Sequence, residues 1–256
     1  MSDYRKVLYL VDGTIARITL NRPDKRNALD GEIIAEIRRA LAESAGNEAV
    51  RVVLLTGVGK DFCAGADLEN IGRLSQDGSV MENFDDARQL GDLFLEMRRH
   101  PRPIVAAVRG RALAGGCGIA TAADVALAAE SAQFGYPEIK IDFVPAMVMA
   151  ILRRSVSDKR ALELLMTGDL IPARTALELG MITRVFADGT FDADVHSYTA
   201  QLAARSSSAL SLTKSLFYQM DSVAFESALS AGVQTNALAR LTDDCRRGIQ
   251  QFLKKS

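Results

Sequence analysis

Continuous apolar runs in the first half of the chain predict strands that are buried on both faces. Such runs cover residues 52–55, 104–108 and 125–127, and each is short enough to be a strand rather than a helix. Residues 15–20 also read as a strand, and a polar, proline-containing loop over residues 21–27 follows it. Because these runs are separated by other patterned segments, α/β crossovers between the strands are expected.

Two segments between these strands have apolar residues at helical spacing. Asp30 can cap the first of these helices at its N-terminus. The residues that share a helical face are Ile33, Ile34, Ile37 and Leu41 in the first segment and Leu90, Leu93, Phe94 and Met97 in the second. Strands that alternate with helices predict an α/β fold. After about Pro145 the pattern is helical nearly to the end, apart from residues 182–186, so the last third is predicted to be a helical extension.

The composition is that of an ordinary globular enzyme. Of the 256 residues, 48% are hydrophobic and 25% are charged, and the formal net charge is −1, which gives no reason to expect a nucleic-acid partner. The three cysteines are far apart and form no CxxC pair, which favours a reducing, cytoplasmic setting. We expect no membrane partner, because no apolar stretch reaches about 18 residues and the N-terminus lacks a signal-peptide pattern.

The chain has few histidines for acid–base chemistry. There are two, His100 and His196. His100 stands between Arg99 and Pro101, so we expect it to be a cation at a helix C-terminus or a simple surface residue. A catalytic base is therefore expected to be a carboxylate.

Two glycine-bearing loops follow buried strands, over residues 56–68 and 110–119. Their small residues allow the backbone to approach a ligand closely, at the place where open α/β sheets bind ligands. The second loop lacks the lysine and hydroxyl residue of a phosphate-binding loop and has Gly116 and Cys117 instead. The glycines also do not form a dinucleotide fingerprint. Each loop taken alone can be merely a tight turn.

The two loops together suggest a more specific chemistry. If residues 115–119 begin a helix, its free N–H groups and the positive end of its dipole favour an anion, or an oxygen that becomes one. Two loops that each donate one N–H to the same oxygen would form an oxyanion hole.

Four segments, taken in order, resemble the crotonase superfamily, also called the enoyl-CoA hydratase/isomerase family. They are Asn21-Arg-Pro-Asp-Lys-Arg-Asn-Ala-Leu29, Phe62-Cys-Ala-Gly-Ala-Asp-Leu68, Leu113-Ala-Gly-Gly-Cys-Gly-Ile119 and Phe134-Gly-Tyr-Pro-Glu-Ile139. The resemblance implies an α/β crotonase-like fold, in which repeated ββα units form a spiral core over residues 1–195. Residues 196–256 would then be a helical trimerisation region, and the protein a homotrimer or a hexamer made of two trimers.

The resemblance also implies the residues of the site. The thioester oxygen of an acyl-CoA would lie between the N–H groups of Ala66 and Gly115, and Glu138 would be the general acid/base. The residues implied to line coenzyme A are Lys25, Arg26, Ala28, Ala64, Ala66, Asp67, Leu68, Phe252 and Lys255, the last two reaching a neighbouring subunit's ligand. No cofactor is implied beyond the coenzyme A of the substrate itself. Cys63 and Cys117 are interpreted as packing residues.

One departure from the family keeps several reactions open. Two-carboxylate hydratases of this family carry glutamate where this chain has Gly118. Asp142 could supply a second carboxylate if the stretch after Glu138 is helical, but the same spacing suits a strand. Hydration of 2-enoyl-CoA is the first hypothesis, and isomerisation of 3-enoyl-CoA with Glu138 as single base is the alternative. A non-catalytic acyl-CoA or RNA binding protein is the alternative from another class.

The apolar residues after Pro145 have two interpretations. They are Met147, Val148, Met149, Ile151 and Leu152. They can line a pocket for the acyl chain, or they can be plain helical core.

Overall fold

A computed structural model describes residues 4–254 and contains a six-stranded sheet in the order β1-β2-β3-β4-β6-β9. The strands are β1 Val7–Asp12, β2 Ile15–Leu20, β3 Val52–Gly57, β4 Ile104–Val108, β6 Val125–Ala129 and β9 Arg184–Phe186. β1 pairs with β2 in antiparallel fashion, and the remaining neighbours are parallel. The predicted strands at β2, β3, β4 and β6 are confirmed. β1 was not predicted, although residues 7–11 form an apolar run.

Helices cover both faces of this sheet. On one face lie α1 Gly31–Gly46, α3 Val80–Arg99 and α4 Ala114–Ala122, and on the other lies α8 Phe191–Ala203. In β3, Val53 and Leu55 pack into the first layer, while Val52 and Leu54 pack against α8. This alternation explains why the strand has a continuous apolar run. α1 begins at Asp30, whose side chain accepts the Ile33 N–H, as the sequence predicts.

A second, three-stranded sheet carries the segments that lead to the candidate site. It consists of β5 Arg111–Leu113, β7 Gln133–Gly135 and β8 Ile171–Pro172. β5 runs directly into α4, and β7 runs into the 3-10 helix η2 Pro137–Ile141. The sequence did not predict these strands, because two or three residues are too few to show a periodicity.

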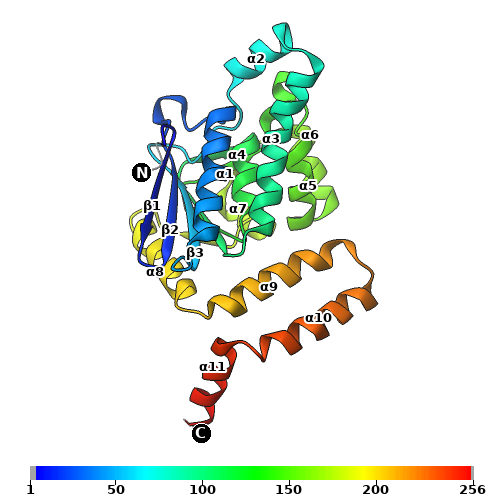
Figure 1. Cartoon of the computed structure of the whole chain (residues 1–256). Coiled ribbons are helices and arrows are strands. Elements are labelled where there is room, and N and C mark those ends of the chain that lie inside the picture. The colour runs from blue at the N-terminus through cyan, green and yellow to red at the C-terminus, as the bar shows by residue number, and fades with distance from the viewer. Residues whose placement is uncertain (1–3, 255–256) are drawn as a thin grey trace.

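The part of the chain after Pro145 is largely helical, as predicted. Its elements are α5 Ala146–Ser155, α6 Asp158–Thr167, α7 Ala173–Glu178, α9 Ser207–Gln219, η3 Met220–Ser222, α10 Phe225–Ala239 and α11 Asp243–Leu253. The remaining elements are η1 Pro23–Lys25 and α2 Leu68–Asp77. Figure 1 shows α9 beneath the body of the molecule and α10 and α11 extending away from it. The division expected between residues 195 and 196 falls within α8 and stays a prediction.

A buried lysine fixes α9 to the body. The Lys214 ammonium donates to the Met97 carbonyl at 2.9 Å and the Arg102 carbonyl at 3.1 Å, and pairs with Asp124 at 2.7 Å. The charge is thus paired and hydrogen-bonded inside the protein, which is the condition for burying one. Within residues 4–254, no helix is both long and apolar enough to cross a membrane.

The prediction for His100 is wrong in one respect. His100 does follow the last residue of α3, but its side chain is buried, with 6% exposed. Its Nε2 lies 3.0 Å from the Ser44 hydroxyl and 3.1 Å from the Leu41 carbonyl. Burial lowers the pKa of His100, so the ring is a neutral packing group rather than a helix-terminal cation.

Candidate functional site

The two glycine-bearing loops contact each other through a short β-bridge. The Cys63 N–H donates to the Arg111 carbonyl at 3.1 Å, and the Leu113 N–H donates to the Cys63 carbonyl at 2.9 Å. A side chain on Gly116 could not fit there, because its Cβ would lie 2.6 Å from the Cβ, carbonyl oxygen and sulfur of Cys63. The glycine therefore permits the start of α4 to pack directly on the first loop.

A second contact between the two loops, from Gly65 to Ala114, is equally close. Gly65 has a φ of +93°, and a Cβ on it would lie 2.6 Å from the Cβ of Ala114. Ala114 itself has a φ of +51°, which is uncommon for a residue with a side chain. Such backbone strain is often found at functional sites. Ala66 and Gly115, the residues after this contact, are thus held next to one another.

Within the described residues, neither the Ala66 N–H nor the Gly115 N–H donates to a protein acceptor. Leu29 donates to the Gly65 carbonyl and accepts from the Asp67 N–H, each at 2.8 Å. Within residues 4–254, these bonds leave the intervening Ala66 N–H without a hydrogen-bond acceptor. The Gly115 N–H belongs to the first turn of α4, where N–H groups lack intrahelical partners. The predicted helix start at residue 115 is confirmed, since α4 begins at Ala114.

A third loop, over residues 22–29, lies against the first. The Ala64 N–H donates to the Arg26 carbonyl at 3.0 Å, and Lys25 pairs with Glu69 at 2.6 Å. The structure therefore places Lys25, Arg26 and Ala28 beside the segment from Ala64 to Leu68, as the resemblance implies. Asp67 caps α2 by accepting the Glu69 N–H, which is the loop-fixing contact expected of such a side chain.

Arg22 joins these loops, and the sequence reasoning missed its role. Its guanidinium donates to the Ala28 carbonyl at 2.8 Å and pairs with Asp30 at 2.9 Å and Asp67 at 3.0 Å. The signal was its place inside the Asn21-Arg22-Pro23 segment, directly after a strand. A half-buried arginine between two loops holds their backbones in register.

Glu138 and Gly115 emerge from the same end of the small sheet. In the parallel pair of β5 and β7, Leu113 lies opposite Gly135. Gly115 follows Leu113 by two residues and Glu138 follows Gly135 by three, so both leave the sheet at its carboxyl end. Glu138 is half-buried, and in the part of the chain that the structure describes, its buried Oε2 has no hydrogen-bond partner. Burial raises the pKa of this carboxyl group.

The position of Gly118 is filled by apolar side chains. Gly118 is buried in α4, and a Cβ on it would lie 2.5 Å from Val148 Cγ1 and 2.8 Å from Phe94 Cζ. Asp142 does not replace the missing carboxylate, because it is exposed at the end of η2. The stretch after Glu138 is thus helical, yet it turns Asp142 outward. The sequence showed that position 118 lacks a glutamate, but it did not show which side chains occupy the space.

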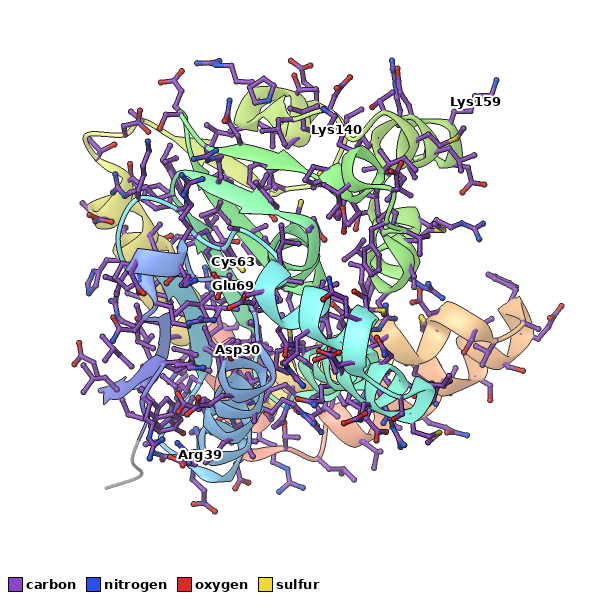
Figure 2. The ribbon with its side chains drawn as sticks, turned by 90° about the horizontal axis from the view of Figure 1, so that it is seen from above. Asp30, Arg39, Cys63, Glu69, Lys140 and Lys159 are labelled. Atoms are coloured by element: carbon purple, nitrogen blue, oxygen red, sulfur yellow. The ribbon has the colours of Figure 1, made fainter. Side chains whose placement is uncertain are left out.

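The two loop cysteines are packing residues. Cys63 lies in the interior in Figure 2, whereas the labelled Lys159 points outward. Burial raises the pKa of Cys63 to about 12 and that of Cys117 to about 12. A thiol with so high a pKa carries almost no thiolate at neutral pH, so neither is suited to nucleophilic attack.

Phe252, one of the two C-terminal residues expected at a neighbouring subunit's coenzyme A, lies away from the two loops of its own chain. Phe252 belongs to α11 and has 73% of its surface exposed. Figure 1 shows α11 at the opposite end of the molecule from α2, which follows the first loop, and α11 contacts α9. Lys255 lies outside the described residues.

Comparisons with known proteins agree on one family. A family model described as enoyl-CoA hydratase/isomerase matches residues 11–256. A Thermus thermophilus protein named "Putative enoyl-CoA hydratase" is 38% identical, over 95% of this chain and 96% of its own length. A 2,3-dehydroadipyl-CoA hydratase of Escherichia coli is 33% identical, over 93% of this chain and 91% of its own. The crystal structure of an enoyl-CoA hydratase from Mycobacterium smegmatis superposes with a TM-score of 0.94 at 30% identity, covering 98% of this chain and 97% of the other.

Proposed function

This chain belongs to the enoyl-CoA hydratase/isomerase family, and we propose that it adds water to 2-enoyl-CoA thioesters in a reducing, cytoplasmic setting. The observation that supports the proposal is the placement of two backbone donors at the contact between two loops, with one half-buried carboxylate after the neighbouring strand. Ala66 and Gly115 offer their N–H groups at the contact between two loops, and Glu138 leaves the neighbouring strand at the same end.

The two N–H groups would stabilise the charge that develops on the thioester oxygen. When a nucleophile adds to C3 of a 2-enoyl thioester, the electron pair moves to this oxygen and an enolate forms. Donors that are already in place need no reorganisation, and the loss of one such donor typically costs about 3 to 4 kcal/mol of transition-state stabilisation. The positive end of the α4 dipole acts in the same direction.

Glu138 would carry the proton in both halves of the reaction. As an ionised carboxylate it takes a proton from the water that attacks C3, and as a carboxylic acid it returns that proton to C2 of the enolate. Both forms must be accessible near neutral pH, and burial raises the pKa of Glu138 in that direction. The thioester is the only activated group in this scheme, so we propose no cofactor beyond the coenzyme A of the substrate.

The loop over residues 22–29 would bind coenzyme A together with the segment from Ala64 to Leu68. Lys25 and Arg26 keep 42% and 62% of their side-chain surface exposed there, which leaves these cations accessible to the phosphates of the ligand. Phe252 and Lys255 would complete the site from a neighbouring subunit.

A second candidate reaction is the isomerisation of 3-enoyl-CoA to 2-enoyl-CoA. The packing of Phe94 and Val148 at Gly118 favours this reaction. These two side chains occupy the place of the second carboxylate, which orients water in two-carboxylate hydratases. A single base suffices to move a proton between C2 and C4 while the same N–H groups hold the dienolate.

The test is turnover in D2O with a 2-enoyl-CoA and, separately, a 3-enoyl-CoA, followed by mass spectrometry. We expect a 3-hydroxyacyl-CoA from the first substrate, and loss of turnover in Glu138→Gln with ester binding changed only a few-fold. Asp142→Asn is the matched control, because this carboxylate lies four residues away and is exposed. Migration of the double bond without added water would instead identify the isomerase. Salt-dependent RNA binding without activity toward any acyl-CoA would identify a binding protein.

We also propose that α9, α10 and α11 form a subunit interface in a trimer or hexamer. Large apolar side chains are exposed along them, and such surfaces mark association sites. They are Phe217, Phe225, Leu229, Val233, Leu238, Leu241, Ile249, Phe252 and Leu253. Light scattering gives the mass directly, and a 27.7 kDa species at micromolar concentration would argue against the interface.

A further inference from the structure

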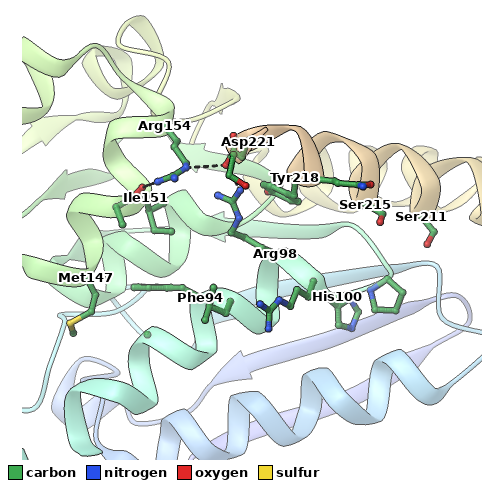
Figure 3. A pocket seen from close by; sticks show the side chains of 17 residues that line it. Phe94, Arg98, His100, Met147, Ile151, Arg154, Ser211, Ser215, Tyr218 and Asp221 are labelled. Atoms are coloured by element: carbon green, nitrogen blue, oxygen red, sulfur yellow. Dashed lines mark hydrogen bonds and ion pairs between the residues drawn. The ribbon is translucent and has the colours of Figure 1, made fainter. Parts of the chain in front are cut away.

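A cavity of about 850 Å³ lies between α3, α5 and α9, away from the two loops (Figure 3). Phe94, Met147 and Ile151 form an apolar part of its wall, and Arg98, Arg154 and Tyr218 form a polar part. A volume of this size is typical of sites that bind small molecules. The apolar residues after Pro145 are therefore divided, since Met147 and Ile151 line the cavity while Val148 and Leu152 pack in the core.

Helix α3 connects this cavity to the candidate site. Leu90 Cδ2 lies 3.2 Å from where a Cβ on Gly115 would be, and Phe94, one turn later, lies at Gly118 and lines the cavity. Arg98 follows one further turn along. From Leu90 to Arg98 the helix rises by about 12 Å. Leu90, Phe94 and Arg98 are spaced four residues apart, so the contact at Gly115 and the Arg98 side chain lie along one face of α3.

The charges at the far end of the cavity are not balanced. Its lining includes three arginines, Arg98, Arg99 and Arg154, but a single carboxylate, Asp221. Arg154 Nε donates to Asp221 at 2.9 Å, and the Arg98 guanidinium pairs with the same oxygen while lying over the Tyr218 ring. Two guanidinium groups thus share one carboxylate, and arginine is the side chain best suited to bind a second one.

We propose that this cavity receives the distal end of the acyl chain and that Arg98 and Arg154 bind a terminal carboxylate there. The preferred substrates are then acyl-CoA thioesters of dicarboxylic acids. The proposal rests on the proposed function for the position of the thioester. A pocket for a purely hydrocarbon chain would gain nothing from arginines, because it would have to desolvate them.

The competing interpretation is that Asp221 merely ties η3 to α3 and α5. The two interpretations differ in what they predict for ligands that differ only at the far end. If the arginines bind a carboxylate, their loss affects carboxylate-ended ligands selectively. If they only hold helices together, their loss affects every ligand alike.

The experiment measures binding of suberyl-CoA and octanoyl-CoA by calorimetry, since these saturated esters differ only in a terminal carboxylate or methyl group. We expect the protein to bind suberyl-CoA at least tenfold more tightly. Arg154→Gln should remove most of that preference, whereas Arg153→Gln should leave it, because Arg153 pairs with Asp158 outside the cavity. Asp221→Asn should strengthen suberyl-CoA binding, since the arginines would no longer share their charge. Weaker binding of both esters in this variant would indicate the tie between helices and overturn the proposal.

The experiment tests the carboxylate site for the acyl tail separately from the proposed hydratase reaction. Equal binding of the two esters overturns the carboxylate site even if 2-enoyl-CoA is hydrated. A clear preference for suberyl-CoA supports the site even if neither corresponding 2-enoyl ester is turned over, in which case the hydratase proposal alone fails.

Discussion

Replacing Gly118 by alanine tests how tightly apolar side chains fill the place of the second carboxylate. The added Cβ would lie 2.5 Å from Val148 Cγ1 and 2.8 Å from Phe94 Cζ. Overpacking of a core typically costs about 1–3 kcal/mol. Alanine in place of glycine inside a helix stabilises the folded state by about 1 kcal/mol. We therefore expect Gly118→Ala to lower the free energy of unfolding by about 1 kcal/mol, within a range of about 0 to 2.

Gly72→Ala is the matched control, because Gly72 lies inside α2 and a Cβ on it would meet nothing within 4 Å. It should raise stability by up to about 1 kcal/mol. In a Val148→Ala background the nearest clash is removed, so Gly118→Ala should become less harmful, with a coupling free energy of about 1 kcal/mol. Urea unfolding at fixed protein concentration measures all four variants. If Gly118→Ala stabilises the protein as much as Gly72→Ala does, the position is not filled as described.

Two further predictions follow from the pKa shifts. Because burial raises the pKa of Glu138 in the folded protein, its ionised form costs stability at neutral pH, and this cost disappears once pH falls below the ordinary carboxyl range. Glu138→Gln should therefore raise the thermal midpoint more at neutral pH than near about pH 4, and an equal gain at both would contradict this reasoning. Cys63 and Cys117 should resist a thiol-reactive dye in the native state while the less buried Cys245 reacts, and mass spectrometry of the labelled peptides would reveal any exception.

The local order of the chain could be predicted because each signal lies within a few residues. The continuous run at residues 52–55 indicated a strand between two layers, and Asp30 indicated the start of α1. Backbone donors at the start of α4 were also predictable, since an N–H in the first helical turn has no internal partner. Glu138 and the Ala66 and Gly115 pair came from the resemblance to a family, and their catalytic roles stay predictions.

Only the tertiary structure decided what lies next to what. His100 ends a helix, as its neighbours indicated, but the packing of Ser44 and Leu41 against it decides that it is buried and neutral. Glu138 and Gly115 leave the small sheet at the same end because Leu113 pairs with Gly135, and no periodicity encodes this pairing.

Contacts between distant residues, which a sequence pattern does not encode, also explain the functional features that only the structure revealed. The sequence by itself determined the strands β2, β3, β4 and β6, the main helices, the family motifs and the absence of glutamate at position 118. The structure decided that Phe94 and Val148 fill that space, and that Arg98 and Arg154 meet around Asp221. Periodicity reports the face on which a residue lies, whereas a contact between distant residues depends on how whole elements pack.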